Sequence, residues 1–247
     1  MFDGFKILLL NSLHILNNNA FEDISTTCKD MGVIHKTVYS YKGFSIYTYQ
    51  EHGTLIMHGS FHKYFNDGIH NYNCFFYQDF VKTVHDFLNV FSINPYNCIL
   101  QNVEYGVNIV IKYEVNKVLD CLLFHENKTP LKPRETDIRF EHQQYKLKIY
   151  NKTEHYTHLT KQSNILRFEV RFERMIKLNN NGIYNLNDLL DLRCLTFFNN
   201  ELLSHWNKIL MYDYTINEKS LVINQKALLK DYKNPQYWEH LKPNKRY

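Results

Sequence analysis

Residues 164–174 carry the sequence NILRFEVRFER, in which apolar side chains alternate with charged ones. A period of two is typical of a β-strand that turns one face to a core and the other to solvent. A second stretch, YKLKIY at residues 145–150, alternates in the same way. The two stretches therefore predict two half-buried strands.

The order of the remaining elements indicates the fold class. Period-two patterns predict further strands at residues 33–50 (a hairpin that turns at Lys42-Gly43), 55–59 and 99–111. Apolar spacings of three and four predict helices at residues 76–91, 115–125, 186–190 (behind the cap Asn185) and 201–211, and polar or proline-containing segments predict loops at 60–73 and 129–137. This alternation is typical of an α+β fold, so we expect a mainly antiparallel sheet covered by helices.

The composition predicts a folded cytoplasmic protein. Apolar residues make up 44% and charged residues 22% of the 247 residues, which excludes a disordered tail. No stretch approaches the ~20 apolar residues that cross a bilayer, and the apolar run at residues 7–10 lacks the flanks of a secretory signal, so no membrane partner is expected. The five cysteines lie at least 23 residues apart and predict neither a zinc knuckle nor a disulfide framework. We expect a single domain over residues 1–247, with a helical and basic C-terminal part from about residue 183.

The formal net charge is only +4, but the charges are unevenly placed. Residues 1–131 carry 9 basic against 12 acidic side chains, whereas residues 132–177 carry 11 against 6 and residues 226–247 carry 6 against 2. A basic central segment and a basic tail suit a polyanionic partner such as a nucleic acid, and a solvated surface gives the same pattern.

The first of three unusually polar segments is HGSFHKY at residues 58–64, continued by GIHN at residues 68–71. Its glycines allow close backbone approach, and the side chains of His62, Lys63 and His70 suit a phosphate or a metal. Ordinary surface histidines in a loop explain the same residues.

The other two polar segments lie in predicted strands. Glu104, in Asn102-Val103-Glu104, is a carboxylate within an apolar strand, so it either points to solvent or binds a charged group. The third segment combines KLKIYNK at residues 146–152 with LRFEVR at residues 166–171, whose basic, carboxylate and phenolic groups would share one face of adjacent strands. That face suits a phosphodiester beside a metal, and a solvated face with cross-strand ion pairs explains it without a ligand.

In this order, the three segments resemble the gene II replication protein family of filamentous phages and the related initiators of rolling-circle plasmids. Residues 58–71 resemble the family's Gly-Ser…Lys-Tyr…Gly-His-Asn block, and Asn102-Val103-Glu104 stands where the family has Arg-hydrophobic-Asp. Ile149-Tyr150-Asn151-Lys152, followed by Leu166-Arg167-Phe168-Glu169, resembles its Tyr-Asp/Asn-Lys…Leu-Arg-Phe-Glu block. The resemblance runs from about Val33 to Trp238.

The resemblance implies a replication initiation protein: a metal-dependent endonuclease that nicks and rejoins one strand of origin DNA through a phosphotyrosine intermediate. It implies Tyr150 as the nucleophile and Lys152 as the residue that positions the scissile phosphate. The implied metal ligands for Mg²⁺ or Mn²⁺ are Glu104, Glu169, His70 and His62, and the implied DNA contacts are Lys63, Lys148 and Arg167. The expected partners are single-stranded or supercoiled origin DNA and a host helicase.

Departures from the family pattern leave other functions open. Asn102 replaces the Arg, which removes a phosphate contact, and Glu104 replaces the Asp, which lengthens the metal ligand by one methylene. The first alternative is a module that binds origin DNA or another nucleic acid without cutting it. The second is an interaction protein, in which Glu104 and Glu169 would pair with Arg or Lys. Tyr145, on the opposite face of its strand from Tyr150, is the rival nucleophile.

Overall fold

The computed structural model describes residues 1–28, 34–49, 54–156 and 164–241. Its strands form a ten-stranded sheet in the order β2-β3-β4-β5-β1-β6-β11-β10-β9-β8, and a two-stranded sheet of β12 and β7. The sheet is antiparallel and is accompanied by helices, which confirms the predicted α+β class. Among the described residues, no helix has the length and hydrophobicity needed to cross a membrane.

Three of the predicted strands lie next to one another in the sheet. They are β6 (Cys98–Val110), β11 (Ile165–Phe172) and β10 (Tyr145–Asn151), in that order. Their bounds agree with the predicted ones to within two residues because the period-two pattern runs through each of them.

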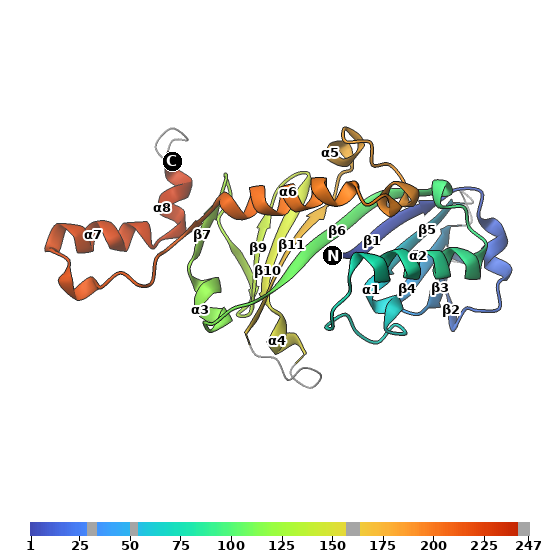
Figure 1. Ribbon diagram of the computed structural model, residues 1–247, viewed down its shortest axis with the longest axis horizontal. Coiled ribbons are helices and arrows are strands. Elements are labelled where there is room, and N and C mark those ends of the chain that lie inside the picture. The colour runs from blue at the N-terminus through green and yellow to red at the C-terminus, as the bar shows by residue number, and fades with distance from the viewer. Residues whose placement is uncertain (29–33, 50–53, 157–163, 242–247) are drawn as a thin grey trace. The chain divides into compact units, whose positions relative to one another are not determined.

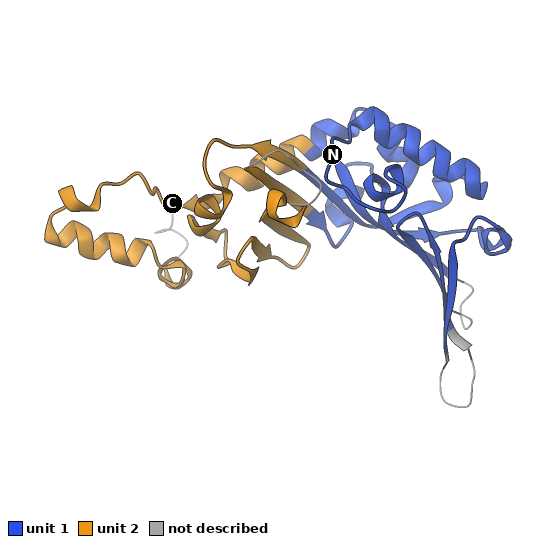
Figure 2. Cartoon of the chain, turned by 90° about the horizontal axis from the view of Figure 1, so that it is seen from below, with its two compact units in different colours: residues 1–106, 171–198 blue, residues 107–170, 199–247 orange. Residues whose placement is uncertain are grey.

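The chain forms two compact units, which Figure 2 colours separately. Unit 1 comprises residues 1–106 and 171–198, and unit 2 comprises residues 107–170 and 199–247. Each unit is built from two separate pieces of chain, and β6, β11 and α6 (Cys194–Asn207) contribute residues to both. The single domain expected over residues 1–247 stays a prediction.

Unit 1 contains the N-terminal strands. Its further elements are β1 (Phe2–Leu9), β2 (Asp23–Cys28), β3 (Ile34–Tyr41), β4 (Phe44–Tyr49), β5 (Thr54–Ser60), α1 (Phe61–Phe65), α2 (Tyr77–Phe91), α5 (Ile176–Asn179) and 3₁₀ helices at Leu13–Asn17, Pro95–Asn97 and Leu186–Leu190. β3 and β4 form the predicted hairpin, whose turn includes Gly43 at φ +80°. β1 pairs antiparallel with both β5 and β6, so the apolar N-terminal run is an inner strand.

Aromatic side chains fill the core of unit 1. The helix α2 covers one face of the strands (Figure 1), and its Phe80 ring lies 4.7 Å from the ring of Phe2. Two helical turns further along α2, the Phe87 ring lies 5.2 Å from the Phe44 ring. All four rings are at most 1% exposed. The spacing of three and four therefore predicted the buried face of α2 correctly.

Unit 2 contains the C-terminal strands and helices. Its further elements are α3 (Val115–Asp120), β7 (Leu122–His125), β8 (Leu131–Arg134), β9 (Asp137–Glu141), α4 (Lys152–His155), β12 (Ile209–Met211), α7 (Ile223–Tyr232), α8 (Pro235–His240) and a 3₁₀ helix at Glu218–Ser220. β9 and β10 pair antiparallel, with Leu147 opposite Phe140 and Ile149 opposite Ile138. All four of these side chains are buried, which confirms the alternation predicted for β10.

Two predicted helices are wrong at their C-terminal ends. α3 ends at Asp120 and the chain continues as β7, while α6 ends at Asn207 and the chain continues as β12. β7 and β12 pair with each other across more than 80 residues of sequence, with Leu210 opposite Phe124. Because this pairing is non-local, an apolar spacing that suits a helix did not reveal it.

Three local predictions also need correction. The loop predicted at residues 60–73 contains α1, and the loop predicted at residues 129–137 contains β8. The strand β11 is not half-buried, because every side chain from Ile165 to Val170 is buried. Its charged positions, Arg167 and Glu169, therefore lie in the interior.

Candidate functional site

Five residues expected at the functional site come together in unit 2, in what we call the Tyr150 cluster. The Tyr150 hydroxyl donates a hydrogen bond to Glu169 Oε1 at 3.2 Å, and Arg167 Nε lies 2.6 Å from the same oxygen. Lys148 Nζ lies 3.8 Å from Glu169 Oε2. The fifth residue, Lys152, joins the cluster through an asparagine of β6. The cluster comprises Asn108, Lys148, Tyr150, Lys152, Arg167 and Glu169.

Asn108 is the member that the sequence did not reveal. Its Oδ1 accepts hydrogen bonds from Arg167 Nη1 at 3.1 Å and from Lys152 Nζ at 3.3 Å. Lys152 is the first residue of α4, and the preceding Asn151 caps that helix by accepting from the Glu154 N–H at 3.3 Å. In the Tyr-Asn-Lys motif, Tyr150 thus lies at the end of β10, Asn151 caps α4, and Lys152 is the buried cation.

Two cations expected to meet a DNA phosphate, Lys152 and Arg167, are buried. Arg167 is 0% exposed and Lys152 is 2% exposed, and their contacts with a phosphate stay predictions. Buried charges require partners, and these two cations have Glu169 and Asn108. The more accessible members are Tyr150, which is half-buried, and Lys148, whose side chain is 21% exposed. A phosphate would have to approach through these two side chains.

In unit 1, Glu104 lies beside a second carboxylate that the sequence did not single out. Glu104 is only 8% exposed, so it does not point to solvent, and a carboxylate oxygen of Asp3 lies within 4.8 Å of one of its own. Gly4 lies beside the Glu104 side chain, and a Cβ on Gly4 would make an ordinary contact of 3.5 Å with Glu104 Cβ. A single acidic residue in an N-terminal strand carries no motif, which is why Asp3 was missed.

The first polar segment positions Asp3. Ser60 Oγ donates a hydrogen bond to Asp3 Oδ1 at 2.5 Å, and Asn71 Nδ2 donates to Asp3 Oδ2 at 2.9 Å. Ser60 also caps α1, since its Oγ accepts from the Lys63 N–H at 3.1 Å. Ser60 of the Gly-Ser pair and Asn71 of the His-Asn pair thus meet at one buried carboxylate.

The glycines of the same segment have a packing role. A Cβ on Gly59 would lie 2.4 Å from Phe44 Cδ1, and a Cβ on Gly68 would lie 2.8 Å from the Gly43 backbone nitrogen. Gly68 also takes φ +82°, a region that other residues rarely adopt. Close packing against the β3–β4 turn therefore explains these glycines without a ligand.

The side chains of His62, His70 and Lys63 lie in and after α1. His62 is fully buried, its ring stacks on Phe75 at 4.6 Å, and its Nε2 is 2.7 Å from Asn73 Oδ1. His70 is half-buried with its ring 4.2 Å from that of Tyr72, and Lys63 is half-buried. Roles of the two histidines as metal ligands and of Lys63 as a DNA contact stay predictions.

The acidic residues fit a hard divalent cation by atom type. Carboxylate oxygens are the ligands that Mg²⁺ and Mn²⁺ prefer. Asp3 and Glu104 offer two such oxygens in unit 1, and Glu169 offers oxygens in unit 2. Glu169 is also paired with Arg167 and Lys148, the arrangement expected of an interaction protein. A metal shared by Glu104 and Glu169 stays a prediction.

A second polar cluster of unit 2, the Tyr145 cluster, surrounds the rival tyrosine. Tyr145 donates a hydrogen bond to Glu126 Oε2 at 3.0 Å, and Lys208 Nζ donates to Glu126 Oε1 at 2.9 Å. His125 Nδ1 lies 2.9 Å from His142 Nε2, and the His142 ring stacks on Tyr145 at 4.5 Å. The cluster comprises His125, Glu126, His142, Tyr145 and Lys208.

Burial sets the charge states in the Tyr145 cluster. It lowers the pKa of His125 to about 4, with His142 adding to the effect, and it also lowers the pKa of His142. Burial and the Glu126 carboxylate raise the pKa of Tyr145 well above its usual value of 10. Burial alone would raise the pKa of Glu126, but the hydrogen bonds from Lys208 and Tyr145 bring it down to about 2. At neutral pH the two histidines are therefore uncharged and Tyr145 is a neutral phenol.

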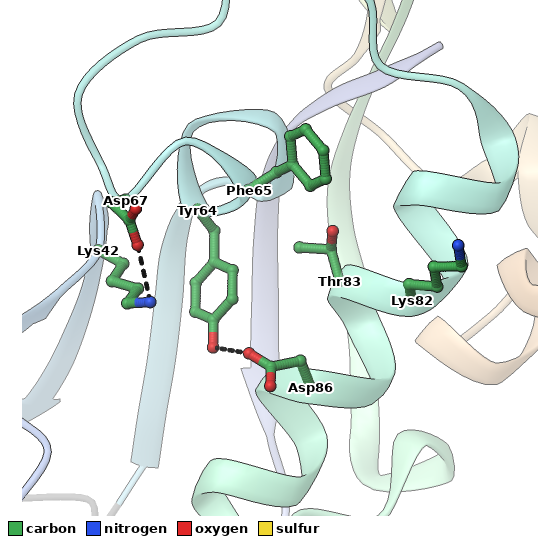
Figure 3. A pocket seen from close by; sticks show the side chains of 7 residues that line it. All are labelled: Lys42, Tyr64, Phe65, Asp67, Lys82, Thr83 and Asp86. Carbon is green, nitrogen blue, oxygen red and sulfur yellow. Dashed lines mark hydrogen bonds and ion pairs between the residues drawn. The ribbon is translucent and has the colours of Figure 1, made fainter.

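A surface pocket of about 220 Å³ in unit 1 offers a different environment. Figure 3 shows Tyr64 between Lys42 and Asp86, with its hydroxyl donating to Asp86 Oδ2 at 2.7 Å. Lys42 Nζ pairs with Asp67 at 2.9 Å, which raises the pKa of Lys42. Because Lys42 already pairs with Asp67 and Asp86 already accepts from Tyr64, the pocket is a weaker candidate than the Tyr150 cluster.

Neither the protein-family models nor the curated protein sequences compared with this chain match it.

Proposed function

We propose that this chain is a replication initiation protein that nicks and rejoins single-stranded origin DNA, with Tyr150 as the nucleophile. The Tyr150 cluster is the observation that supports the proposal: a phenol lies 3.2 Å from a carboxylate that Lys148 and Arg167 also contact. A phenol with a pKa of ~10 is a weak nucleophile at neutral pH. In the proposal, Glu169 accepts its proton and Lys148 stabilises the phenolate.

In the proposed reaction, Tyr150 Oη attacks the phosphorus of a phosphodiester and the bond from phosphorus to the 3′ oxygen breaks. The phenolic proton passes to Glu169, and the leaving 3′ oxygen takes a proton from water to become a 3′ hydroxyl. The 5′ phosphate stays on Tyr150, so a later attack by a 3′ hydroxyl rejoins the strand without ATP.

The proposed cofactor is Mg²⁺ or Mn²⁺, and within unit 1 Asp3 and Glu104 are its proposed ligands. Such a cation would supply charge neutralisation at the phosphate. Within unit 1, Ser60 and Asn71 fix the Asp3 carboxylate, so this ligand would be held before any cation arrives.

A second candidate is a module that binds nucleic acid without cutting it. The observation that favours it is the ion pair between Arg167 and Glu169, which are 2.6 Å apart and at most 2% exposed. A carboxylate in such a pair can stabilise the fold without accepting a proton from Tyr150. Lys148 would serve phosphate binding in either case.

A covalent-adduct assay distinguishes the two candidates. The full chain is incubated with a 3′-end-labelled single-stranded DNA pool of random sequence and Mn²⁺, and the products are separated under denaturing conditions. An initiator transfers the label to the protein, and the transfer requires the Tyr150 hydroxyl. DNA binding without any labelled protein would contradict the nicking proposal and support the binding module.

A further inference from the structure

The Tyr145 cluster contains the ligand set of a transition-metal site, distinct from the acidic residues of the proposed nicking reaction. One ligand atom each of His125, Glu126 and His142 lies within 4.8 Å of the other two. Two imidazoles and a carboxylate are a ligand set that zinc uses with a fourth, open position. Mg²⁺ prefers all-oxygen sites, so this cluster favours a different metal.

The backbone brings these three side chains together. His125 is the last residue of β7, and backbone hydrogen bonds in both directions, each 3.0 Å, close a turn between His125 and Lys128. Glu126 inside that turn takes φ +52°, the left-handed region that is uncommon for glutamate. His142 follows the end of β9, so two strand ends supply the ligands.

We infer that His125, Glu126 and His142 bind one Zn²⁺ ion. The separation of 2.9 Å between His125 Nδ1 and His142 Nε2 is close to what shared ligation needs. Two nitrogens about 2.0–2.1 Å from a tetrahedral zinc are about 3.4 Å apart, so the rings need to part by roughly 0.5 Å. The proton now shared between these nitrogens would move to the far nitrogen of its ring, leaving both facing atoms as ligands.

The surroundings of the ligands support this assignment. His125 is fully buried, and the His142 ring stacks on Tyr145. Tyr145 also holds Glu126 Oε2 at 3.0 Å, as groups around metal ligands commonly do. Lys208 is a competitor, because its ammonium occupies Glu126 Oε1 at 2.9 Å, but its side chain is 46% exposed and free to turn to solvent. Zinc and Lys208 would therefore compete for one carboxylate oxygen.

The test is isothermal titration of the full chain, made without a histidine tag, with Zn²⁺ alone. Wild type is expected to bind one equivalent, and His142→Gln, a change at a half-buried residue, is expected to weaken binding at least 100-fold. His85→Gln, at an exposed position of α2, is the matched control and should bind like wild type.

Lys208→Ala distinguishes a metal site from a histidine pair that only stabilises the fold, because only a metal site should bind Zn²⁺ more tightly in this variant. It frees Glu126 Oε1 and is expected to tighten Zn²⁺ binding about tenfold. Co²⁺ should report the same ligands by visible absorption that is present in wild type and absent in His142→Gln. Equal Zn²⁺ binding by wild type and a folded His142→Gln variant, or no binding by wild type, would overturn the inference.

Discussion

Strand β10 carries two tyrosines whose hydroxyl groups make the same contact in different surroundings. Tyr145 donates to Glu126 at 3.0 Å and Tyr150 donates to Glu169 at 3.2 Å, and a lysine contacts each glutamate. The tyrosines are five residues apart on a strand, so they point to opposite faces. They therefore form a natural pair in which one serves as the control for the other.

The neighbours of the two hydroxyl–carboxylate pairs differ. Around Tyr145 lie two uncharged histidines, whereas Glu169 beside Tyr150 is also contacted by the guanidinium of Arg167. Burial and Glu126 raise the pKa of Tyr145, which makes it a poorer nucleophile. The contact between a phenol and a carboxylate is therefore the same on both faces, and the groups around it are what differ.

The largest expected effect is on covalent catalysis. Tyr150→Phe keeps the ring and removes only the hydroxyl, so nicking and the protein–DNA adduct should fall by about 10³-fold or more. The fold and DNA binding should survive. Tyr145→Phe is the matched change and should leave the adduct in place. Adduct formation by Tyr150→Phe, together with its loss in Tyr145→Phe, would reverse the comparison.

The next largest effect is on stability, through the buried ion pair beneath Tyr150. Arg167→Gln leaves Glu169 buried and poorly compensated, so the free energy of unfolding should fall by about 3 kcal/mol in a urea titration. The control, Lys132→Gln, breaks a pair with Asp120 in which both side chains are exposed (44% and 64%), and should cost under about 1 kcal/mol. Equal effects would show that burial does not distinguish these pairs.

The Tyr145 cluster should make stability depend on pH in metal-free protein. The pKa of folded His125 is about 4, below the value of 6.5 for an exposed histidine, so the unfolded state binds protons first as pH falls. Stability is therefore full above about pH 6.5 and should drop by about 2 kcal/mol between pH 7 and pH 5. Urea titrations in EDTA measure this drop in the free energy of unfolding. His142→Gln should change the size of the drop, and His85→Gln should leave it as in wild type. Stability that is constant from pH 7 to pH 5 would contradict this electrostatic account.

The smallest expected effect is on DNA binding by Lys148. Its partly exposed ammonium is the cation of the Tyr150 cluster best placed for a phosphate, so Lys148→Ala should flatten the slope of log affinity against log salt by about 0.7 for single strands. Lys117→Ala, at a side chain 70% exposed on α3, is the control. Identical slopes in wild type and Lys148→Ala would separate Lys148 from DNA binding.

The strands around the Tyr150 cluster could be predicted from the sequence, and its burial could not. Alternation assigned Arg167 and Glu169 to one face of β11 correctly, because the side-chain period of a strand is fixed by backbone geometry. Alternation does not reveal whether the polar face is covered, and here both faces of β11 are buried. Arg167 therefore lies buried on Glu169, and its DNA contact stays a prediction.

Non-local pairing explains the other misses. Asn108 became part of the cluster because β6 lies beside β11, and Asp3 came beside Glu104 because β1 lies beside β6. The ligand set of the Tyr145 cluster was missed for the same reason, since His125 and His142 sit at two strand ends 17 residues apart. A cue was present in the adjacent His125-Glu126 pair, but two such residues are common without a metal.

The central claim, that Tyr150 rather than Tyr145 forms the covalent link, can be read directly from peptides. Trypsin separates the three nearest tyrosines, because Tyr145 falls in residues 140–146, Tyr150 in residues 149–152 and Tyr156 in residues 153–161. The protein–DNA adduct is digested with nuclease and trypsin, and mass spectrometry locates the remaining nucleotide. The account predicts a nucleotide linked through its 5′ phosphate to Tyr150 in peptide 149–152, and a nucleotide on peptide 140–146 or 153–161 would contradict it.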